Sequence, residues 1–226
     1  MRGALITGTD TGVGKTVLTA AIVAALRARG RPLRVLKPVI TGLDEPAEGG
    51  WPRDHELLAA LAGVGPQEVA PIGYGPAVSP HLAAEMAGRP IDVEQLRGIL
   101  AEAASGPEVL VIEGVGGLLV PLTDSYSVRD LARDAGLPVL IAARPGLGTI
   151  NHTLLTLESA RAAGLEVSGV VLTPWPVDPG EIERSNLETI ARLGRVEVAT
   201  LRRIDAPLPD LLAAAAESLP LERWLG

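Results

Sequence analysis

The stretch Gly8-Thr9-Asp10-Thr11-Gly12-Val13-Gly14-Lys15-Thr16 directly follows an apolar segment, Ala4–Thr7, and leads into a run of helical composition. A strand, a glycine-rich turn and a helix in this order are typical of a phosphate-binding loop, because backbone N–H groups and the helix N-terminus converge on one anion. In such a loop the lysine reaches the β- and γ-phosphates and the following hydroxyl binds Mg²⁺. We expect these roles for Lys15 and Thr16, although one residue more than usual separates Gly8 from Gly14. A glycine-rich turn without phosphate would give Gly-Lys-Thr no evident purpose.

Outward from this loop, short apolar segments alternate with longer helical patterns. The expected strands are Ala4–Thr7, Leu33–Leu36, Val109–Ile112, Val139–Ala142, Val167–Leu172 and Val196–Thr200. The expected helices are Lys15–Arg29, Asp54–Ala62, Pro80–Ala87, Asp92–Ala104, Val128–Ala135, Thr149–Ala163 and Glu181–Leu193. This alternation predicts an α/β fold with a mostly parallel β-sheet and helices on both of its faces.

Length and composition are those of one globular domain. The 226 residues are enough for one large α/β domain, and no linker or repeat divides them, so we expect a single domain over residues 1–226. The formal net charge of -7 argues against nucleic-acid and membrane partners, which need a basic face. The absence of cysteine excludes disulfides, thiolate metal sites and a cysteine nucleophile.

Neither a signal peptide nor a membrane span is evident in the sequence. The N-terminus, MRGALITGTD, lacks the apolar core of a signal peptide. The longest apolar run, Val17–Leu26, is too short to cross a bilayer. We therefore expect a soluble, cytoplasmic protein.

Lysine is almost absent from this chain, which makes its two positions informative. Only Lys15 and Lys37 occur among the 20 basic residues, so these two positions favour a compact ammonium over a guanidinium. Lys37 ends the second expected strand, before Pro38. Ligands of open α/β sheets bind beyond the carboxyl ends of the strands, so we expect Lys37 to face the same crevice as the phosphate loop.

Two carboxylates are candidates for binding Mg²⁺. Glu113 ends the strand Val109–Ile112, where an acid in a nucleotide-binding sheet can hold the ion or its water shell. A cap of the next turn is the alternative for this residue. Asp54 begins an expected helix and is a second candidate ligand, with helix N-capping as its equally weighted alternative.

These motifs together resemble the dethiobiotin synthetase family, in order and over about two-thirds of the chain. The resemblance rests on Gly-Thr-Asp-Thr-x-Val-Gly-Lys-Thr, Lys37-Pro38-Val39, Ser79-Pro80-His81, Glu113-Gly114-Val115-Gly116-Gly117 and Leu147-Gly148-Thr149-Ile150-Asn151-His152. It implies a P-loop NTPase-like ligase that uses Mg²⁺ and ATP to close the ureido ring of 7,8-diaminononanoate with CO2 or bicarbonate. The implied route runs through a carbamate and a carbamic-phosphoric anhydride to dethiobiotin, ADP and phosphate.

The resemblance also implies roles for individual residues. Those that would hold the reacting phosphoryl oxygens and the carbamate are Lys15, Lys37 and Thr11. Those that would hold Mg²⁺ are Thr16, Asp54 and Glu113. Those that would bind the nucleotide are Gly12, Val13, Gly14, Lys15, Thr16, Val17, Glu113, Gly116, Thr173 and Pro174. Those that would bind the diamine are Thr41, Ser79, Gly148, Thr149, Ile150 and Asn151, the last four across the interface of a homodimer with a shared active site.

The chain departs from the family pattern in two places that bear on function. Gly12 stands where an acid is frequent, which removes one contact to the diamine. Thr173-Pro174 stands where an Asn-Asp pair reads adenine, which predicts relaxed selectivity for the nucleotide base.

Two other functions stay open. A switch ATPase of the partition or septum-positioning type has a similar sheet and loop, but carries an additional lysine early in the loop, where this chain has Thr9 and Asp10. A cobyrinate-type amide synthetase would need a glutaminase cysteine or free ammonia.

Overall fold

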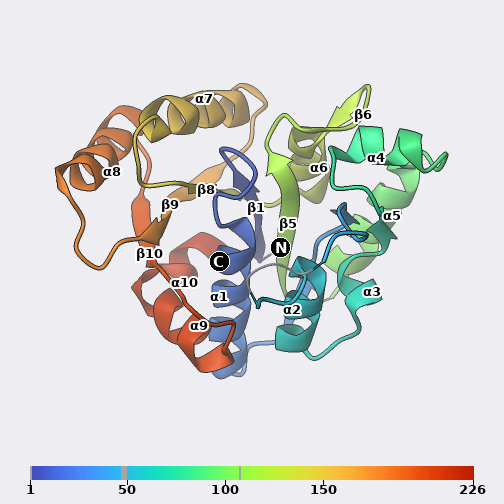
Figure 1. Ribbon diagram of the computed structural model, residues 1–226, viewed down its shortest axis with the longest axis horizontal. Helices are drawn as coiled ribbons and strands as arrows, with labels where there is room; N and C mark the ends of the chain where they lie inside the picture. The colour runs from blue at the N-terminus through green and yellow to red at the C-terminus, as the bar shows by residue number, and fades with distance from the viewer. Residues whose placement is uncertain (1, 47–49, 107) are drawn as a thin grey trace.

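A sheet of six parallel strands forms the centre of the computed structural model, which describes residues 2–46, 50–106 and 108–226 (Figure 1). The strand order is β10-β9-β8-β1-β5-β2, and all neighbours are parallel. The strands are β1 (Gly3–Gly8), β2 (Leu33–Leu36), β5 (Val109–Gly117), β8 (Val139–Ala143), β9 (Val167–Trp175) and β10 (Val198–Arg202). The predicted fold class is confirmed.

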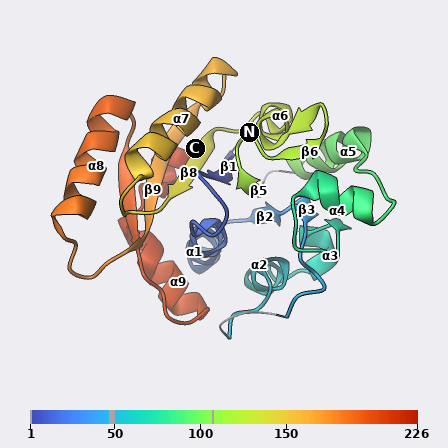
Figure 2. The same cartoon turned by 45° about the horizontal axis from the view of Figure 1, so that its top comes forward.

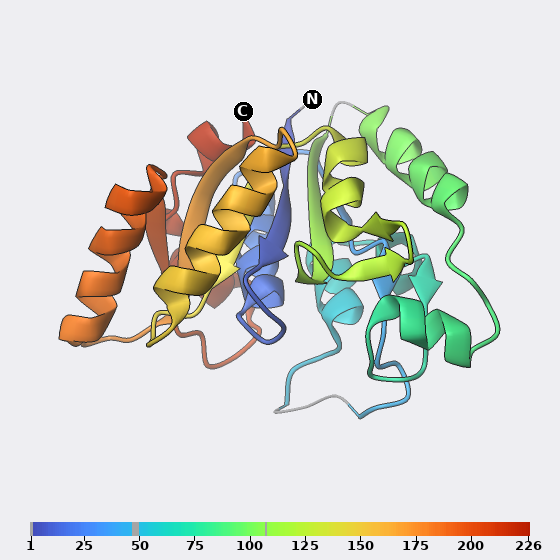
Figure 3. The ribbon, with the colours of Figure 1, turned by 90° about the horizontal axis from the view of Figure 1, so that it is seen from above.

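Helices cover both faces of this sheet. One face is covered by α1 (Lys15–Ala28), α2 (Asp54–Ala62), α9 (Pro209–Ala215) and α10 (Leu221–Leu225). The other is covered by α5 (Val93–Ala104), α6 (Val128–Ala135), α7 (Thr149–Ala162) and α8 (Glu181–Gly194), and α4 (Pro80–Met86) adds to the same core. Figure 2 shows α7 and α8 on one side of the sheet and α1, α2 and α9 on the other, and Figure 3 shows α7 in front of the strands.

Strand β1 shows why the sequence of this sheet reads as unbroken apolar runs. Ala4 and Ile6 belong to the core under α1, whereas Leu5 between them belongs to the opposite core. All three are fully buried. A parallel strand that is covered on both faces needs apolar residues at every position.

Several elements differ from the sequence-based expectation. Strands β5 and β9 continue to Gly117 and Trp175, well beyond Ile112 and Leu172, and β10 begins at Val198 instead of Val196. The expectation omitted α9, α10, the short helices α3 (Pro66–Val69) and η1 (Ala216–Ser218), and four short strands. These strands pair β3 (Val39–Ile40) with β4 (Ile72–Gly73), and β6 (Pro121–Thr123) with β7 (Tyr126–Ser127).

The segments that carry the predicted site residues lie at the carboxyl ends of the parallel strands. Gly8 ends β1, Lys37 follows β2, and Arg144 follows β8. Glu113 lies within β5 beside Ile6 of β1. Among the helices of the described residues, none has both the length and the apolar character to cross a membrane.

Candidate active site

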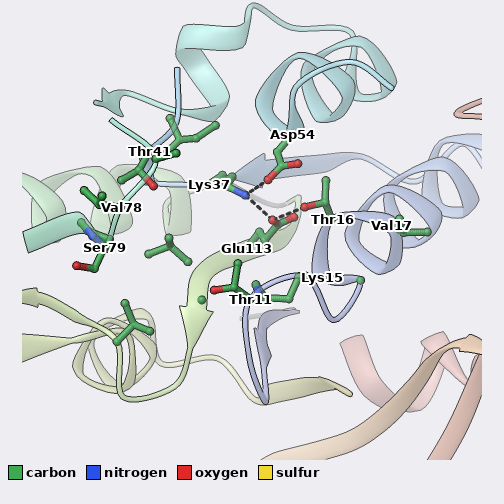
Figure 4. A pocket seen from close by; sticks show the side chains of 18 residues that line it. Thr11, Lys15, Thr16, Val17, Lys37, Thr41, Asp54, Val78, Ser79 and Glu113 are labelled. Atoms are coloured by element: carbon green, nitrogen blue, oxygen red, sulfur yellow. Dashed lines mark hydrogen bonds and ion pairs between the residues drawn. The ribbon is translucent and has the colours of Figure 1, made fainter. Parts of the chain in front are cut away.

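A cavity of about 670 Å³ lies at the carboxyl ends of the strands, beside the phosphate loop (Figure 4). Four segments contribute its polar walls: the phosphate loop with the start of α1, the β2–β3 region, the residues before α4, and β5. Its lining includes Thr11, Gly12, Gly14, Lys15, Thr16, Val17, Lys37, Thr41, Asp54, Ser79, Glu113 and Gly116. The structure therefore brings together most of the residues that the sequence singled out.

The phosphate loop has a backbone that requires glycine. Gly12 and Gly14 adopt φ values of +69° and +92°, in the left-handed region that side chains disfavour. A Cβ atom on Gly14 would also lie 2.8 Å from Cγ2 of Thr173. The Lys15 ammonium donates to the Asp10 carbonyl at 2.9 Å, so the lysine side chain folds back over the phosphate loop.

Lys37 lies at the centre of a cluster of ionised groups (Figure 4). Its ammonium donates to Glu113 Oε1 at 2.7 Å and pairs with the Asp54 carboxylate. The Thr16 hydroxyl donates to the same Glu113 oxygen at 2.8 Å. Glu113 is completely buried and the Lys37 side chain is only 6% exposed. The cluster links α1, β5, α2 and the turn after β2.

Burial and ion pairing act in opposite directions on these groups. Burial alone would lower the pKa of Lys37, but the Glu113 and Asp54 carboxylates outweigh it and hold this pKa above the ordinary lysine range. Burial would raise the pKa of Asp54, but Lys37 holds it below its usual value. For Lys15 burial is the dominant effect and lowers the pKa, although Glu113 opposes it. Lys37 and Asp54 are therefore both charged at neutral pH.

The structure argues against a capping role for either of the two carboxylates. Asp54 is the first residue of α2, whose N-cap is Arg53, so its side chain pairs with Lys37 and does not cap the helix. Strand β5 does not end at Glu113, so this residue caps no turn. The expectation that Glu113 ends its strand was wrong, because β5 continues alongside β1 as far as Gly117.

The donor set of this cluster fits a magnesium ion. Glu113 Oε2 is buried and has no hydrogen-bond partner in the described part of the chain, which leaves one carboxylate oxygen available. The Asp54 side chain is 44% exposed. The described residues contain no group of three His, Cys, Asp or Glu side chains suited to a metal. Mg²⁺ needs no such group, because it binds through one or two carboxylates, substrate phosphates and water.

Apolar side chains complete the cavity, and no sequence motif singled them out as site residues. They are Ile40, Ala77, Val78, Pro80, Val115 and Val120. Three of them are sequence neighbours of predicted polar residues: Ile40 precedes Thr41, and Val78 and Pro80 flank Ser79. A mixed wall of this kind accommodates a ligand that has both charged ends and methylene groups.

The segment Gly148–Asn151 does not reach this cavity. It begins α7, and Thr149 lies instead against a hollow of about 90 Å³ beside Thr9, Asp10 and Arg144. Asn151 is exposed. Within one chain, the expected diamine-binding residues are thus divided between two places.

The pair Thr173-Pro174 does not line the cavity either. It lies in β9 with a cis peptide bond, and Thr173 is buried with its methyl group close to Gly14. Pro174 is exposed. Val13, also expected to bind nucleotide, is buried under the loop.

Comparisons with known proteins agree with this arrangement. A family model described as an AAA domain matches residues 2–204. The ATP-dependent dethiobiotin synthetase of Mycobacterium sp. (strain JLS) is 43% identical over 197 residues, which cover 86% of this chain and 85% of the relative. The enzyme of the same name from Aquifex aeolicus is 37% identical over 221 residues, covering 97% and 98% of the two chains.

Solved structures with the same fold are more distant in sequence. The MinC:MinD cell division protein complex of Aquifex aeolicus matches with a TM-score of 0.54 at 17% identity, covering 95% of this chain and 86% of the other. The cell division ATPase MinD of Pyrococcus furiosus matches with a TM-score of 0.51 at 16% identity, covering 97% and 100%. At these identities the likeness concerns the fold alone.

Proposed function

The chain belongs to the ATP-dependent dethiobiotin synthetase family, and we propose that it forms dethiobiotin from 7,8-diaminononanoate, CO2 and ATP in biotin biosynthesis. The observation that carries this proposal is the Lys37 cluster, which lies between a phosphate loop and a wall of hydroxyl and apolar side chains in one cavity. Such a cavity can hold the triphosphate of a nucleotide on the side of the phosphate loop and a second, partly apolar substrate on the side of the opposite wall.

The proposed reaction has three steps that balance in atoms and charge. One amine attacks the carbon of CO2 and loses a proton, which gives a carbamate. A carbamate oxygen attacks the γ-phosphorus of ATP and displaces ADP. The second amine then attacks the carbamoyl carbon of the mixed anhydride, phosphate leaves, and the ureido ring closes with loss of a second proton.

Five polar side chains of the cavity have roles in this reaction. Lys15 and Lys37 stabilise the charge that develops on the transferred phosphoryl group, an effect that is large in a site with little water. The Thr11 hydroxyl binds the carbamate or a phosphoryl oxygen. Thr41 and Ser79, on the opposite wall in Figure 4, hydrogen-bond the diamine end.

Thr16, Asp54 and Glu113 are the residues that would hold Mg²⁺. When bound, the ion would supply positive charge that offsets the negative charge of the phosphates. The charges of the site support this assignment, because Lys15 and Lys37 are balanced by Asp54 and Glu113. A nucleotide with four negative charges would therefore enter a site without net positive charge unless a metal cation bound with it.

The Glu113→Gln variant should require more Mg²⁺ for activity. It keeps the shape of the side chain and the hydrogen bond from Thr16, but it removes the charge that faces the ion. We expect the midpoint of activity against Mg²⁺ to rise at least about tenfold, because even the loss of a group that only supports a metal site lowers metal affinity by about 10–100-fold. Circular dichroism and thermal unfolding serve as controls for folding. An unchanged midpoint in a folded variant would restrict Glu113 to orienting Lys37.

Selectivity for the nucleotide base should be low. A threonine hydroxyl offers one hydrogen bond where an asparagine amide offers a donor and an acceptor together, and Thr173 is buried against Gly14. Discrimination between ATP and CTP or GTP should be smaller by about 1–3 kcal/mol than a bidentate amide contact gives. The ratio of kcat/KM values for the three nucleotides measures it. A strong preference for ATP would place the base contacts elsewhere, such as in the segment 201–208.

The active site is proposed to be shared between two copies of this chain. A groove of about 420 Å³ runs beside the phosphate loop, between the segment after β5 and α7. Leu119 and Leu155 line this groove and are 58% and 56% exposed, and Leu147, beside the neighbouring 90 Å³ hollow, is 94% exposed. Apolar side chains gathered in this way are characteristic of an interface. A second copy there would place its Gly148–Asn151 segment near the phosphate loop of the first.

A simple assay tests the proposed function. Purified protein is incubated with Mg²⁺ and ATP, and phosphate release is measured with the diamine alone, with bicarbonate alone and with both. We expect release only with both substrates, together with a product of the mass of dethiobiotin. Stimulation by DNA or lipid vesicles, without any response to the diamine, would instead support a switch ATPase.

A further inference from the structure

Hydrogen bonds hold the loop between β8 and α7, residues 144–148, at two points outside the proposed active site. At one point, Nη2 of Arg144 donates to the carbonyl of Thr11 in the phosphate loop at 3.2 Å. At the other, the buried Asn186 of α8 donates its Nδ2 hydrogens to the carbonyls of Pro145 and Gly146 at 2.8 and 3.1 Å. One short loop thus joins the phosphate loop to α8.

The contact at Thr11 has a direct effect on the next amide of the phosphate loop. In a trans peptide the C=O and the following N–H point in opposite directions. A Thr11 carbonyl that faces Arg144 therefore aims the N–H of Gly12 away from the guanidinium. Glycine at position 12 also leaves this peptide free to rotate, because no Cβ restricts it. Without a hydrogen bond, the peptide would sample both orientations.

The surroundings of Gly12 leave room for Arg144 to act in this way. A Cβ atom on Gly12 would lie 3.8 Å from Nη2 of Arg144, so the guanidinium rests against the glycine backbone. Gly12 itself lines the main cavity, and the amide of Thr9 is held by the carbonyl of Ala142 at 3.0 Å. The end of β8 thus supports the phosphate loop on both sides of Asp10.

We propose that Arg144 is a positioning residue that fixes the Thr11–Gly12 peptide with its amide toward bound phosphate, and that Asn186 positions the loop that carries Arg144. This inference rests on the proposed function only in one respect, that the cavity binds a nucleoside triphosphate. In this role Arg144 acts through the Thr11 carbonyl and not by contact with the phosphates. It lowers the cost of ordering the loop before they bind.

Nucleotide affinity tests the proposal without any turnover. The Kd values of a non-hydrolysable ATP analogue with Mg²⁺, and of AMP, are measured by calorimetry for the full chain and for Arg144→Ala, Arg144→Lys and Asn186→Ala. The control is Arg161→Ala, because Arg161 also donates from an exposed guanidinium to a distant backbone carbonyl, that of Arg195, at 3.2 Å. Thermal unfolding monitors the fold of each variant.

We expect Arg144→Ala to bind the ATP analogue about fivefold more weakly, as the loss of one net hydrogen bond would cause. Arg144→Lys, which can still donate to the carbonyl, should recover part of this affinity. Asn186→Ala should weaken the analogue in the same direction. AMP, which lacks the β- and γ-phosphates, should bind equally to all variants, and the Arg161→Ala control should match the unaltered chain.

Three results would overturn the proposal. The first is an equal loss of affinity for AMP, which would indicate general damage. The second is the same loss in Arg161→Ala. The third is a loss that disappears in 0.5 M salt, since screening at that ionic strength removes a long-range charge effect but leaves a hydrogen bond. Analogue binding without diamine-dependent phosphate release would refute the proposed substrates and leave this comparison of Arg144 variants intact.

Discussion

Turnover by the Lys37→Arg enzyme should fall at least about a hundredfold, while its Michaelis constant for ATP stays within about twofold of the original value. Lys37 is buried between two carboxylates, with Glu113 Oε1 at 2.7 Å. A guanidinium is planar and larger than an ammonium, and it cannot place its charge at the same point. Because the proposed role of Lys37 concerns charge that develops during phosphoryl transfer, its loss affects the rate and not the binding of ATP.

Steady-state kinetics with saturating diamine and bicarbonate measure this effect. Arg34→Lys is the matched control, because it makes the reverse exchange on the preceding strand, at a side chain that bonds only to the Glu102 carbonyl among the contacts of the described residues. We expect the control to retain full turnover. Unaltered turnover in Lys37→Arg, or a rise in the Michaelis constant that accounts for the whole loss of kcat/KM, would contradict the proposed role.

The charged half of the candidate site could be predicted from local sequence. Lys15 and Thr16 follow from the loop motif, and Lys37 and Glu113 from their places along two expected strands. A parallel sheet brings such positions to one edge, whatever the distance between them in the chain. What the sequence could not provide is their pairing, in which Lys37 contacts both Asp54 and Glu113.

Other features depend on tertiary contacts that leave little trace in local sequence. The pairs β3–β4 and β6–β7 have strands of two or three residues, too short for a periodic pattern. Helix α9, PDLLAAA, is too short and too uniformly apolar to show a helical period, and it is placed by its packing on α1. Arg144 directly follows the observed strand β8, one residue beyond the expected end at Ala142, but its bond to Thr11 joins residues 133 apart in the sequence and leaves no local signal.

The likeness to MinD structures illustrates that a shared fold does not by itself assign a function. The fold is shared, yet this chain has Thr9 and Asp10 where the pattern expected of a switch ATPase has an additional lysine. The second lysine of this chain is Lys37, which directly follows β2 and pairs with two carboxylates. A cation placed there faces the cavity of its own chain, which suits a ligase that activates a second substrate beside the nucleotide.

Mixing two inactive variants, Lys15→Ala and Asn151→Ala, should restore roughly a quarter of full activity if the site is shared across a two-fold dimer. Each variant alone is expected to be nearly inactive, because one lacks the phosphate-loop lysine and the other lacks a residue of the proposed diamine site. After mild unfolding and reassociation, random pairing makes about half of the dimers mixed. In a mixed dimer, one site combines the intact Lys15 of one chain with the intact Asn151 of the other, and the second site carries both changes.

The two arrangements of the site predict different outcomes of this experiment. If each chain held a complete site, every site in a mixed dimer would carry one of the two changes, and no activity would return. The separation of Asn151 from the main cavity within one chain favours the shared arrangement. Mixing Lys15→Ala with Lys37→Ala is the matched control, because both residues line the same cavity of one chain. In that mixture each site receives Lys15 and Lys37 from a single chain, so activity should stay absent even though mixed dimers form.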